Sequence, residues 1–353
     1  MPNNAHRHPS ALVLGILVLA ALVSTDCVTS RSGRPLPAPP GTAVDTILIG
    51  IRGSESKVHA LAIDEYVLGS LLAEADLSDL DAAAVHRLAR VQAILARTYA
   101  LANLGRHADQ GFDLCATTHC QVYRPVDRVP VDLVRVARDA VRATAELVLT
   151  FDGQPINAVF HADCGGHTSD ADAVWKGAAP PYLRGAPDVF CLWEGPTTWR
   201  FEIDASALRD LFNQDTRTRV GAHLDELVIT RVDHAGRVQQ VGLEGEYRPE
   251  ISGVQLRALL TARFGPRSIR GTRFSTHRAG ARIVFEGQGV GHGVGLCQAG
   301  AKARARDGDS PRTILQHYYP GTRLQERSAN PARPSHPRHS LSDSLVHRRR
   351  AGR

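Results

Sequence analysis

The pattern of apolar and polar positions predicts one long folded body of short strands and helices, from about residue 45 to residue 327. The apolar, β-branched run Thr46–Ile51 predicts the first strand. Asp64 is a good helix N-cap and predicts a helix that ends near Ala75. A second helix, rich in Ala, Leu and Arg, is predicted over Ala82–Leu104. Its apolar positions recur at helical spacing: Val85, Leu88, Val91 and Leu95.

The rest of the body continues with short elements of both kinds. Further strands are predicted at 147–151, 156–161, 200–203, 227–231, 238–243 and 282–285, the first two forming a hairpin around Gly153. Further helices are predicted at 132–145, 206–213, 252–264 and 299–306, with another that starts at Ser310-Pro311. Because strands and helices do not alternate regularly, this order predicts an α+β fold.

The N-terminal segment has the pattern of an export signal. Arg7 precedes a 13-residue apolar run, Ala11–Val23. A membrane-spanning helix needs about 20 apolar residues, whereas this shorter length is typical of a signal-peptide core. Cys27 resembles the acceptor site of a bacterial lipoprotein, although Asp26 stands where a small residue is usual. We predict export to the cell envelope through residues 1–27, with lipid attachment at Cys27, conventional cleavage or an uncleaved anchor as alternatives.

The two segments that flank the body differ from it in composition. Residues 28–44 contain four prolines and predict a linker. Residues 328–353 contain six arginines and one acid, so they carry +5 of the formal net charge of +6. They are also poor in apolar residues, which predicts a disordered basic tail. The body itself is nearly neutral, which argues against nucleic-acid binding.

Glu74 is the most distinctive polar residue of the first predicted helix. Val67 and Leu71 lie seven and three residues before it, so all three share one helical face. A carboxyl group on an apolar face loses hydration, which raises its pKa and favours the protonated form. A general acid that cleaves a glycosidic bond needs that property. Alternatively, Glu74 is an ordinary residue near a helix end whose carboxylate reaches water or a structural arginine.

Two short loops combine cysteine with histidine. The first contains Cys115, His119 and Cys120, and the second contains Cys164. Cysteine and histidine are common zinc ligands, so these four residues are a candidate metal site. In an exported protein, the cysteines of the two loops and Cys191 would alternatively form two disulfides, with three connectivities open. Free thiols are the third alternative, and a Cys–His nucleophile lacks an identifiable orienting partner.

A glycine-rich loop lies near the C-terminal end of the body. Five glycines alternate with other residues between Gly287 and Gly295, and His292 lies among them. Such a sequence lets the backbone approach a ligand closely. It lacks the Lys-Ser/Thr end of a P-loop, and nothing marks it as a dinucleotide fingerprint. The string continues through Gln298 to Ile314-Leu-x-x-Tyr-Tyr-Pro-Gly-Thr322.

Two further motifs accompany this string, namely Tyr66-Val-Leu-Gly up to Glu74, and Ala96-Arg-Thr-Tyr-Ala100. Together, the three motifs resemble the SpoIID/LytB family of bacterial cell-wall proteins, which includes peptidoglycan lytic transglycosylases and amidase enhancers. The matching motifs span about residues 64–322, with a divergent middle. The resemblance implies a SpoIID-like mixed body of helices and sheets with a substrate cleft.

The resemblance also implies that Glu74 is the catalytic acid. Arg90 and Arg97 match basic positions of the family on the second helix and, seven residues apart, share a face. They would fix Glu74 or bind sugar hydroxyls and carboxylates, and the alternative is an interhelical ion pair. The family usually has Met-Pro after the acid, whereas this chain has Ala75-Asp76. Asp76 would then lie close enough to alter the titration of Glu74.

Other matching positions imply contacts with the sugar. Tyr182 and Arg184 lie in a Pro-Tyr-Leu-basic segment, where they would stack on a sugar and bind its lactyl carboxylate; the alternative is an ordinary loop with a packed tyrosine. His292 would touch substrate or make a structural hydrogen bond. Two departures change the chemistry: the usual His-Ser-Thr is here His161-Ala-Asp163, and Cys297 replaces a common serine.

By this resemblance the expected activity is lytic transglycosylation of peptidoglycan. Glu74 would protonate the glycosidic oxygen between N-acetylmuramic acid and N-acetylglucosamine, and the muramic acid's 6-hydroxyl would close a 1,6-anhydro ring. A single acid/base suffices for this reaction, whereas ordinary glycosidases usually need two carboxylates. The alternatives are a non-catalytic, glycan-binding enhancer of a separate amidase, and a wall scaffold stabilised by zinc or disulfides. Expected partners are glycan strands, an amidase and, through the N-terminal anchor, the membrane; no cofactor is required, with zinc as the alternative.

Overall fold

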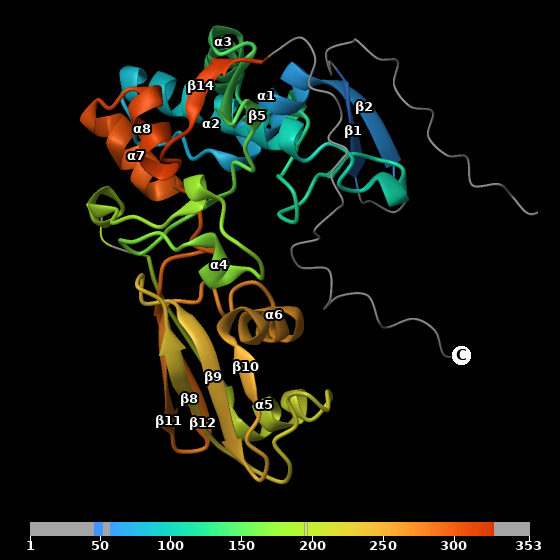
Figure 1. Cartoon of the computed structure of the whole chain (residues 1–353), viewed down its shortest axis with the longest axis vertical. Coiled ribbons are helices and arrows are strands. Elements are labelled where there is room, and N and C mark those ends of the chain that lie inside the picture. Colours follow the sequence, from blue (N-terminus) through green and yellow to red (C-terminus); the bar gives the residue numbers. More distant parts are fainter. Residues whose placement is uncertain (1–45, 52–56, 194, 196, 328–353) are drawn as a thin grey trace, which may run out of the picture. The chain divides into compact units, whose positions relative to one another are not determined.

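The computed structural model of the protein describes residues 46–51, 57–193, 195 and 197–327. The predicted export signal with Cys27, the linker and the basic tail lie outside these described residues. The described chain combines helices with several small sheets, which confirms the predicted α+β class (Figure 1). Its apolar side chains form two separate buried clusters, one around the N-terminal helices and one around the strands of residues 198–288.

The first sheet leads directly into the helix that carries Glu74. Its strands, in the order β2-β1-β3, are β1 (Thr46–Ile51), β2 (Lys57–Ala62) and β3 (Leu114–Cys115). β2 pairs with β1 in antiparallel fashion, and β3 pairs with β1 in parallel fashion. The predicted first strand is confirmed. The sequence did not predict β2, because its residues are largely exposed and do not form a pattern of buried apolar positions.

The helical layer contains α1 (Ile63–Glu74), α2 (Ala82–Ala102) and α3 (Val131–Ala143), which contact one another. Asp81 begins α2, since its carboxylate accepts a hydrogen bond from Ala84 N at 2.7 Å. The prediction that Asp64 caps α1 is wrong. Ala62 holds the cap position without a side-chain bond, and Asp64 lies in the first turn.

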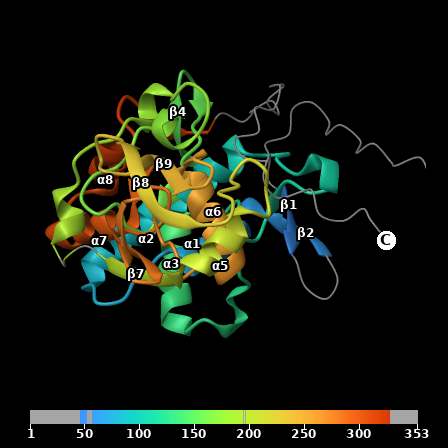
Figure 2. The same cartoon turned by 90° about the horizontal axis from the view of Figure 1, so that it is seen from below.

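The C-terminal end of the body returns to these helices. α7 (Gln298–Asp307) and α8 (Pro311–Tyr318) both contact α2, and Figure 2 shows α7 close to α2. Ser310 caps α8 as predicted, by accepting a hydrogen bond from Thr313 N at 3.1 Å. An antiparallel sheet has the strand order β14 (Arg323–Glu326), β4 (Leu147–Phe151) and β5 (Gln154–Pro155).

One predicted pairing is replaced by a long-range one. β6 (Phe160–His161) pairs in parallel with β13 (Leu296–Cys297) and not with β4, so the predicted hairpin ends at β5. This pairing joins the loop of Cys164 to the glycine-rich loop. Within that loop, Gly293 has φ +85°, and a Cβ there would overlap the Arg237 guanidinium, so this position requires glycine.

The second buried cluster lies among two three-stranded antiparallel sheets and two helices. The sheets are β11 (Phe274–Ala279), β12 (Arg282–Gln288) and β7 (Thr198–Asp204), and β10 (Glu250–Ser252), β9 (Val238–Gly245) and β8 (Leu224–Val232). The helices are α5 (Ala205–Phe212) and α6 (Gly253–Phe264). Short helical turns complete the fold: η1 (Ala108–Gln110), η2 (Val126–Arg128), α4 (Ala171–Val174), η3 (Pro181–Leu183) and η4 (Val189–Leu192).

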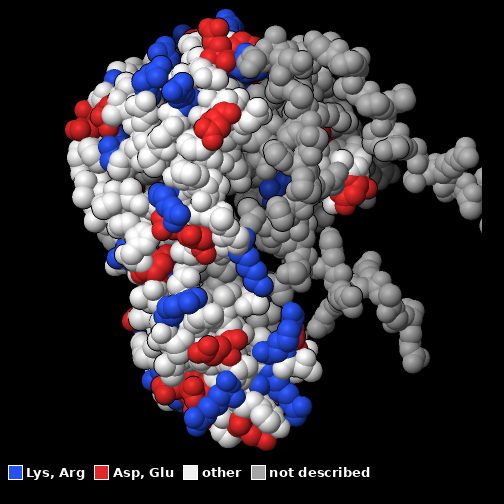
Figure 3. Space-filling model, viewed as in Figure 1, with Lys and Arg blue, Asp and Glu red and all other residues white. Residues whose placement is uncertain are grey.

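The surface carries charges of both signs. Figure 3 shows acidic and basic side chains interspersed over the described part of the displayed face. Recognition on this face must therefore depend on individual side chains and not on a field of one sign. Among the described residues, no helix is both long enough and apolar enough to cross a membrane.

Candidate functional site

Glu74, the last residue of α1, lines a cavity of about 440 Å³. α2 contributes Leu88 and Gln92 to the lining, and α7 contributes Gln298 and Lys302. Leu88 and Gln92 lie four residues apart and therefore share the helical face that borders the cavity. Two helices that are distant in sequence thus enclose the end of α1.

Two hydrogen bonds fix the position of Glu74. Its Oε1 accepts from Val122 N at 2.7 Å, and its backbone oxygen accepts from Gln298 Nε2 at 3.0 Å. Val67 and Leu71 are fully buried on the same helix, as the apolar pattern predicted. Among the described residues, Glu74 Oε2 has no hydrogen-bond partner, so this oxygen is available to a substrate.

Burial raises the pKa of Glu74, against the opposing effects of the Val122 hydrogen bond and the positive charge of Arg124. Asp76 is not among the groups that shift the pKa of Glu74, and its own carboxylate Oδ2 binds Lys302 Nζ at 2.7 Å. Burial acts to raise the pKa of Asp76, but the bonds from Lys302 and Ser78 lower it overall. Glu74 therefore keeps its proton to higher pH than an ordinary glutamate, beside an acid that stays ionised.

A second carboxyl group lines the same cavity. Asp163 accepts hydrogen bonds from Gly165 N at 2.7 Å and from Thr197 N at 3.0 Å. Burial raises its pKa in spite of the bonds from Thr197. In the sequence, Asp163 stood out only as a departure from His-Ser-Thr, because β6 and the loop after it have no local pattern that points to the cavity.

The structure places Arg97 away from Glu74. Its side chain is buried, and its guanidinium donates to Thr144 O at 2.7 Å and Val141 O at 3.4 Å in α3 and its C-cap. It also pairs with Asp64 Oδ1 at 3.0 Å. Arg90 is exposed. At 100° per residue, Arg90 lies nearly opposite the α2 face that borders the cavity, and so does Arg97.

Replacing Arg97 with methionine is expected to lower the free energy of unfolding. The change removes the charged donor of two buried carbonyl groups, which within the described chain keep only the bonds from Leu147 N and Thr144 Oγ1, and a hydrogen bond to a charged group contributes about 1.5–3 kcal/mol. Arg90→Met is the matched control on the same helix, with an expected change within about 0.5 kcal/mol. Urea denaturation followed by circular dichroism measures both. Equal stability of the two variants would contradict the structural role of Arg97.

Tyr182 and Arg184 are not among the described residues that line the Glu74 cavity. Tyr182 lies in η3, where its hydroxyl accepts from Asn157 N at 3.3 Å and its ring packs on Phe151. Burial raises the pKa of Tyr182. Arg184 pairs with Asp170 at 3.3 Å and with Asp172 at 3.4 Å. These contacts account for both residues as parts of a well-ordered loop.

His292 uses both ring nitrogens within the protein. Nε2 donates to Phe160 O at 2.9 Å, and Nδ1 accepts from Val294 N at 3.1 Å. Burial lowers the pKa of His292 to about 4, so the ring is neutral near pH 7. The glycine-rich loop therefore uses this histidine to hold β13 beside β6.

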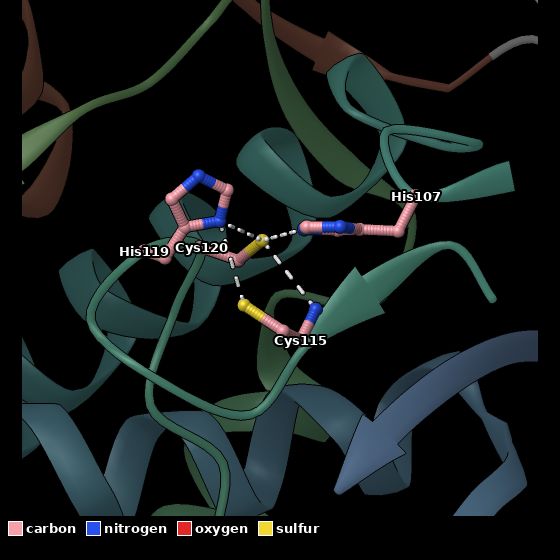
Figure 4. A group of neighbouring side chains, drawn as sticks. All are labelled: His107, Cys115, His119 and Cys120. Atoms are coloured by element: carbon pink, nitrogen blue, oxygen red, sulfur yellow. Dashed lines mark hydrogen bonds between the residues drawn. The ribbon is translucent and has the colours of Figure 1, made fainter. Parts of the chain in front are cut away.

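The first cysteine loop folds into a compact group of four ligands, shown in Figure 4. His107 Nε2 lies 3.3 Å from Cys120 Sγ, and His119 Nδ1 lies 3.7 Å from Cys115 Sγ and 3.8 Å from Cys120 Sγ. We call His107, Cys115, His119 and Cys120 the histidine–cysteine cluster. Tetrahedral zinc with its usual bond lengths places such atoms about 3.3–3.8 Å apart, so the residues fit this ion.

Sequence reasoning did not include His107 in this group. The sequence shows that His107 lies in the segment that leads to Cys115. Because the turn η1 and the strand β3 lie in this segment, the sequence alone does not show that the two side chains come together. Cys164 belongs to a different group, with Asp188, Cys191 and Cys297. The four cysteines that the disulfide alternative would pair therefore divide between two places. All five cysteines of the described chain are free thiols.

The fold and the cavity define an α+β protein whose site centres on one partly buried glutamate with a raised pKa. Comparison with known proteins agrees with this class. The family model described as SpoIID, Stage II sporulation protein, matches residues 52–151, which include Glu74 and the histidine–cysteine cluster. This match and the relatives named Stage II sporulation protein D and Amidase enhancer support the resemblance to the SpoIID/LytB family that the sequence motifs predicted.

Three relatives illustrate the extent of the similarity. An uncharacterized protein of Brachyspira hyodysenteriae is 29% identical over 266 residues, which cover 75% of this chain and 67% of that protein. Stage II sporulation protein D of Bacillus subtilis is 25% identical over 289 residues, 79% of this chain and 78% of that protein. The amidase enhancer of Bacillus subtilis is 25% identical over 275 residues, 67% of this chain but only 37% of that protein.

Proposed function

We propose that this protein is a peptidoglycan lytic transglycosylase with Glu74 as its general acid and base. The observation that carries the proposal is the position of Glu74. The carboxyl group lies in a cavity, has one oxygen without a hydrogen-bond partner in the described part of the chain, and has a raised pKa caused by burial. These are the properties of a carboxylic acid that is suited to donate a proton to a substrate.

The reaction needs one group that first gives and then takes a proton. Protonated Glu74 donates its proton to the glycosidic oxygen between N-acetylmuramic acid and N-acetylglucosamine as the bond to the muramic C1 breaks. The 6-hydroxyl of the same muramic acid then attacks C1, and the Glu74 carboxylate accepts the hydroxyl proton. The products are a 1,6-anhydromuramic end and a free 4-hydroxyl, and Glu74 is again protonated.

The rest of the cavity supplies groups suited to a sugar. Gln92 is buried on α2 and lines the cavity, and its Nε2 has no hydrogen-bond partner among the described residues. Phe190 also lines the cavity, and its ring lies 4.4 Å from the half-exposed Trp193. Ligand sites typically combine apolar and aromatic walls with a few placed polar groups. These residues, and not Arg90 or Arg97, are our candidates for glycan contacts.

A second function, enhancement of a cell-wall amidase, is favoured by one finding. The relative from Bacillus subtilis named amidase enhancer is similar over two thirds of this chain. Such a protein would bind glycan in the same cavity without needing a titratable group at position 74. The amidase would then be a protein partner of this chain.

We further propose that the histidine–cysteine cluster binds zinc. All four positions of a tetrahedral site are taken by protein ligands, which is the arrangement of a structural site. Gln110 Nε2 lies 3.2 Å from His107 Nδ1, and with the amide turned so that its oxygen accepts from Nδ1–H, Gln110 would orient the ring with Nε2 toward the ion. Cys120 lies two residues before Val122, whose N–H binds Glu74. A bound ion would therefore fix the loop that positions the acid.

The location we propose is the cell envelope, with the N-terminal segment as export signal and the lipid on Cys27 as its anchor. This proposal rests on the sequence of residues 1–27.

The experiment for the catalytic proposal uses purified glycan strands, incubated with the full chain and analysed by mass spectrometry. Anhydromuramic ends support the transglycosylase, and intact strands together with stimulation of an added amidase support the enhancer.

A further inference from the structure

A second group of potential metal ligands lies outside the proposed reaction. It consists of three thiols and one carboxylate whose ligand atoms all lie within 4.8 Å of one another: Cys164, Asp188, Cys191 and Cys297. All four side chains are buried. They come from three distant segments, namely the turn after β6, the turn η4 with its cap, and the residue that caps α7. We propose that these residues, the cysteine–aspartate cluster, bind a second zinc ion.

Backbone N–H groups surround two of the three sulfur atoms. Cys297 Sγ lies 3.3 Å from Cys164 N and 3.4 Å from Gly300 N, and Cys164 Sγ lies 3.3 Å from Gly166 N. Hydrogen bonds to a charged form stabilise it, and the thiolate is the form that binds metals. The Gly300 contact also caps α7. These N–H groups would remain as donors to the thiolates that a bound metal ion requires.

Asp188 is held in place toward the sulfur atoms. Its Oδ2 accepts from the Tyr318 hydroxyl at 2.8 Å and lies 3.5 Å from Cys164 Sγ. A Cβ on Gly300 would overlap both the Asp188 carboxylate and the Tyr318 hydroxyl, so glycine is needed where α7 passes this group. Hydrogen bonds that orient a ligating carboxylate are a usual feature of metal sites.

A buried cation lies next to the cluster. Arg237 is fully buried, and its guanidinium donates to the backbone oxygen of Cys164 at 3.1 Å. Within the described chain, the Arg237 guanidinium makes no ion pair with a carboxylate, although burying an uncompensated charge is costly. A zinc ion with three thiolates and one carboxylate is a net anion. The loaded cluster would therefore supply the counter-charge for Arg237.

A disulfide explains this arrangement less well than a metal ion does. Pairing any two of the three sulfurs would leave the third thiol outside the bridge and Asp188 with only its hydrogen bonds, such as those to Tyr318 and Cys191 N, whereas one tetrahedral ion uses all four ligands. In the metal-free protein the Cys191 thiol donates to Asp163 Oδ1 at 3.2 Å. Loading with zinc would release that proton, as metal binding to thiols does.

The site would cross-link the wall of the Glu74 cavity. Cys191 lines that cavity, and Cys297 directly precedes Gln298, whose amide binds the backbone oxygen of Glu74. An ion held by η4, the turn after β6 and α7 would fix these segments relative to one another. This inference concerns architecture and does not depend on whether Glu74 is catalytic.

The test counts zinc in the full chain, produced with zinc in the medium and purified without chelator or reductant. Elemental analysis is expected to find about two zinc ions per chain, one for each four-ligand cluster. Cys297→Ser and Cys115→Ser, one in each cluster, should each lose one ion, and the double variant should lose both. X-ray absorption of Cys115→Ser should then show a zinc shell dominated by sulfur.

Several results would overturn the proposal. The first is that Cys297→Ser retains all of the zinc of the wild type. The second is that the intact mass of the unfolded, unreduced chain is two hydrogens too low, because two of the three thiols form a disulfide. Should a variant fail to fold, anomalous scattering of wild-type crystals at the zinc absorption edge decides the question. A peak between the four ligand atoms of the cysteine–aspartate cluster supports the site, and its absence refutes it.

Discussion

Replacing Glu74 with glutamine is expected to reduce the cleavage of glycan strands by at least about a hundredfold, because general acid catalysis typically contributes about 10²–10⁴-fold. Glutamine keeps the size of the side chain, and its oxygen still accepts the hydrogen bond from Val122 N. It cannot donate the proton that the leaving oxygen requires. Glycan binding, measured by co-sedimentation with insoluble strands, should persist in the variant. Unchanged cleavage would exclude Glu74 as the acid.

The pH dependence separates a catalytic effect from structural damage. Because the pKa of Glu74 is raised, wild-type cleavage should be full below that pKa and fall as the pH rises through it. Folding also favours the protonated form, so the contribution of Glu74 to stability is present below the unfolded pKa and lost as the pH rises through the folded one. The variant should therefore be at least as stable as the wild type at pH 7. A variant that is both inactive and less stable there would point to damage.

Removing a ligand of the histidine–cysteine cluster is expected to have the largest effect on stability. His119→Ala should lower the free energy of unfolding by about 2–5 kcal/mol, the range found when a native cross-link is removed from a small domain. A structural zinc site stabilises the fold directly, because the unfolded chain does not hold the ion in the same way. Cleavage should fall as well, since the loop of the cluster carries Val122.

An exposed histidine in the sheet that carries Cys115 gives the control. His59 lies on β2, and His59→Ala should leave stability within about 0.5 kcal/mol of the wild type. Thermal unfolding with and without a chelator measures both effects. The chelator should destabilise the wild type and the His59 variant by more than it destabilises His119→Ala, which keeps only the second proposed zinc site. Equal behaviour of the two variants would contradict a metal site at the cluster.

The elements that the sequence predicted correctly are those whose signal is local. α2 is an example, because its apolar residues recur at helical spacing and Asp81 caps it. The first turn of α1 shows the limit of that reasoning. Asp64 has the chemistry of a cap, but Arg97 of α2 recruits its carboxylate, so a tertiary contact overrides the local preference. β6 likewise pairs with β13, more than 130 residues away. The sequence did not predict this pairing, because backbone hydrogen bonds leave no pattern in the side chains.

The candidate site also has parts that the sequence predicted and parts that it did not. The burial of Val67 and Leu71 beside Glu74 follows from helical spacing, and the structure places Glu74 in a cavity. The spacing of Arg90 and Arg97 correctly placed them on one side of α2, but it could not say which element that side meets. Ligands from one loop, such as Cys115 and Cys120, were recognisable as a group. The association of Cys164 with Cys297 depends on long-range pairing and was not.

Transglycosylation and hydrolysis of glycan strands leave different muramic ends, so the new chain ends show which reaction this chain catalyses. Purified strands are incubated with the full wild-type chain and with Glu74→Gln, and the ends are identified by mass spectrometry. We expect 1,6-anhydromuramic ends with the wild type and at least about a hundredfold fewer with the variant. Uncleaved strands with a folded wild-type chain, or reducing muramic ends formed by addition of water, would exclude transglycosylation.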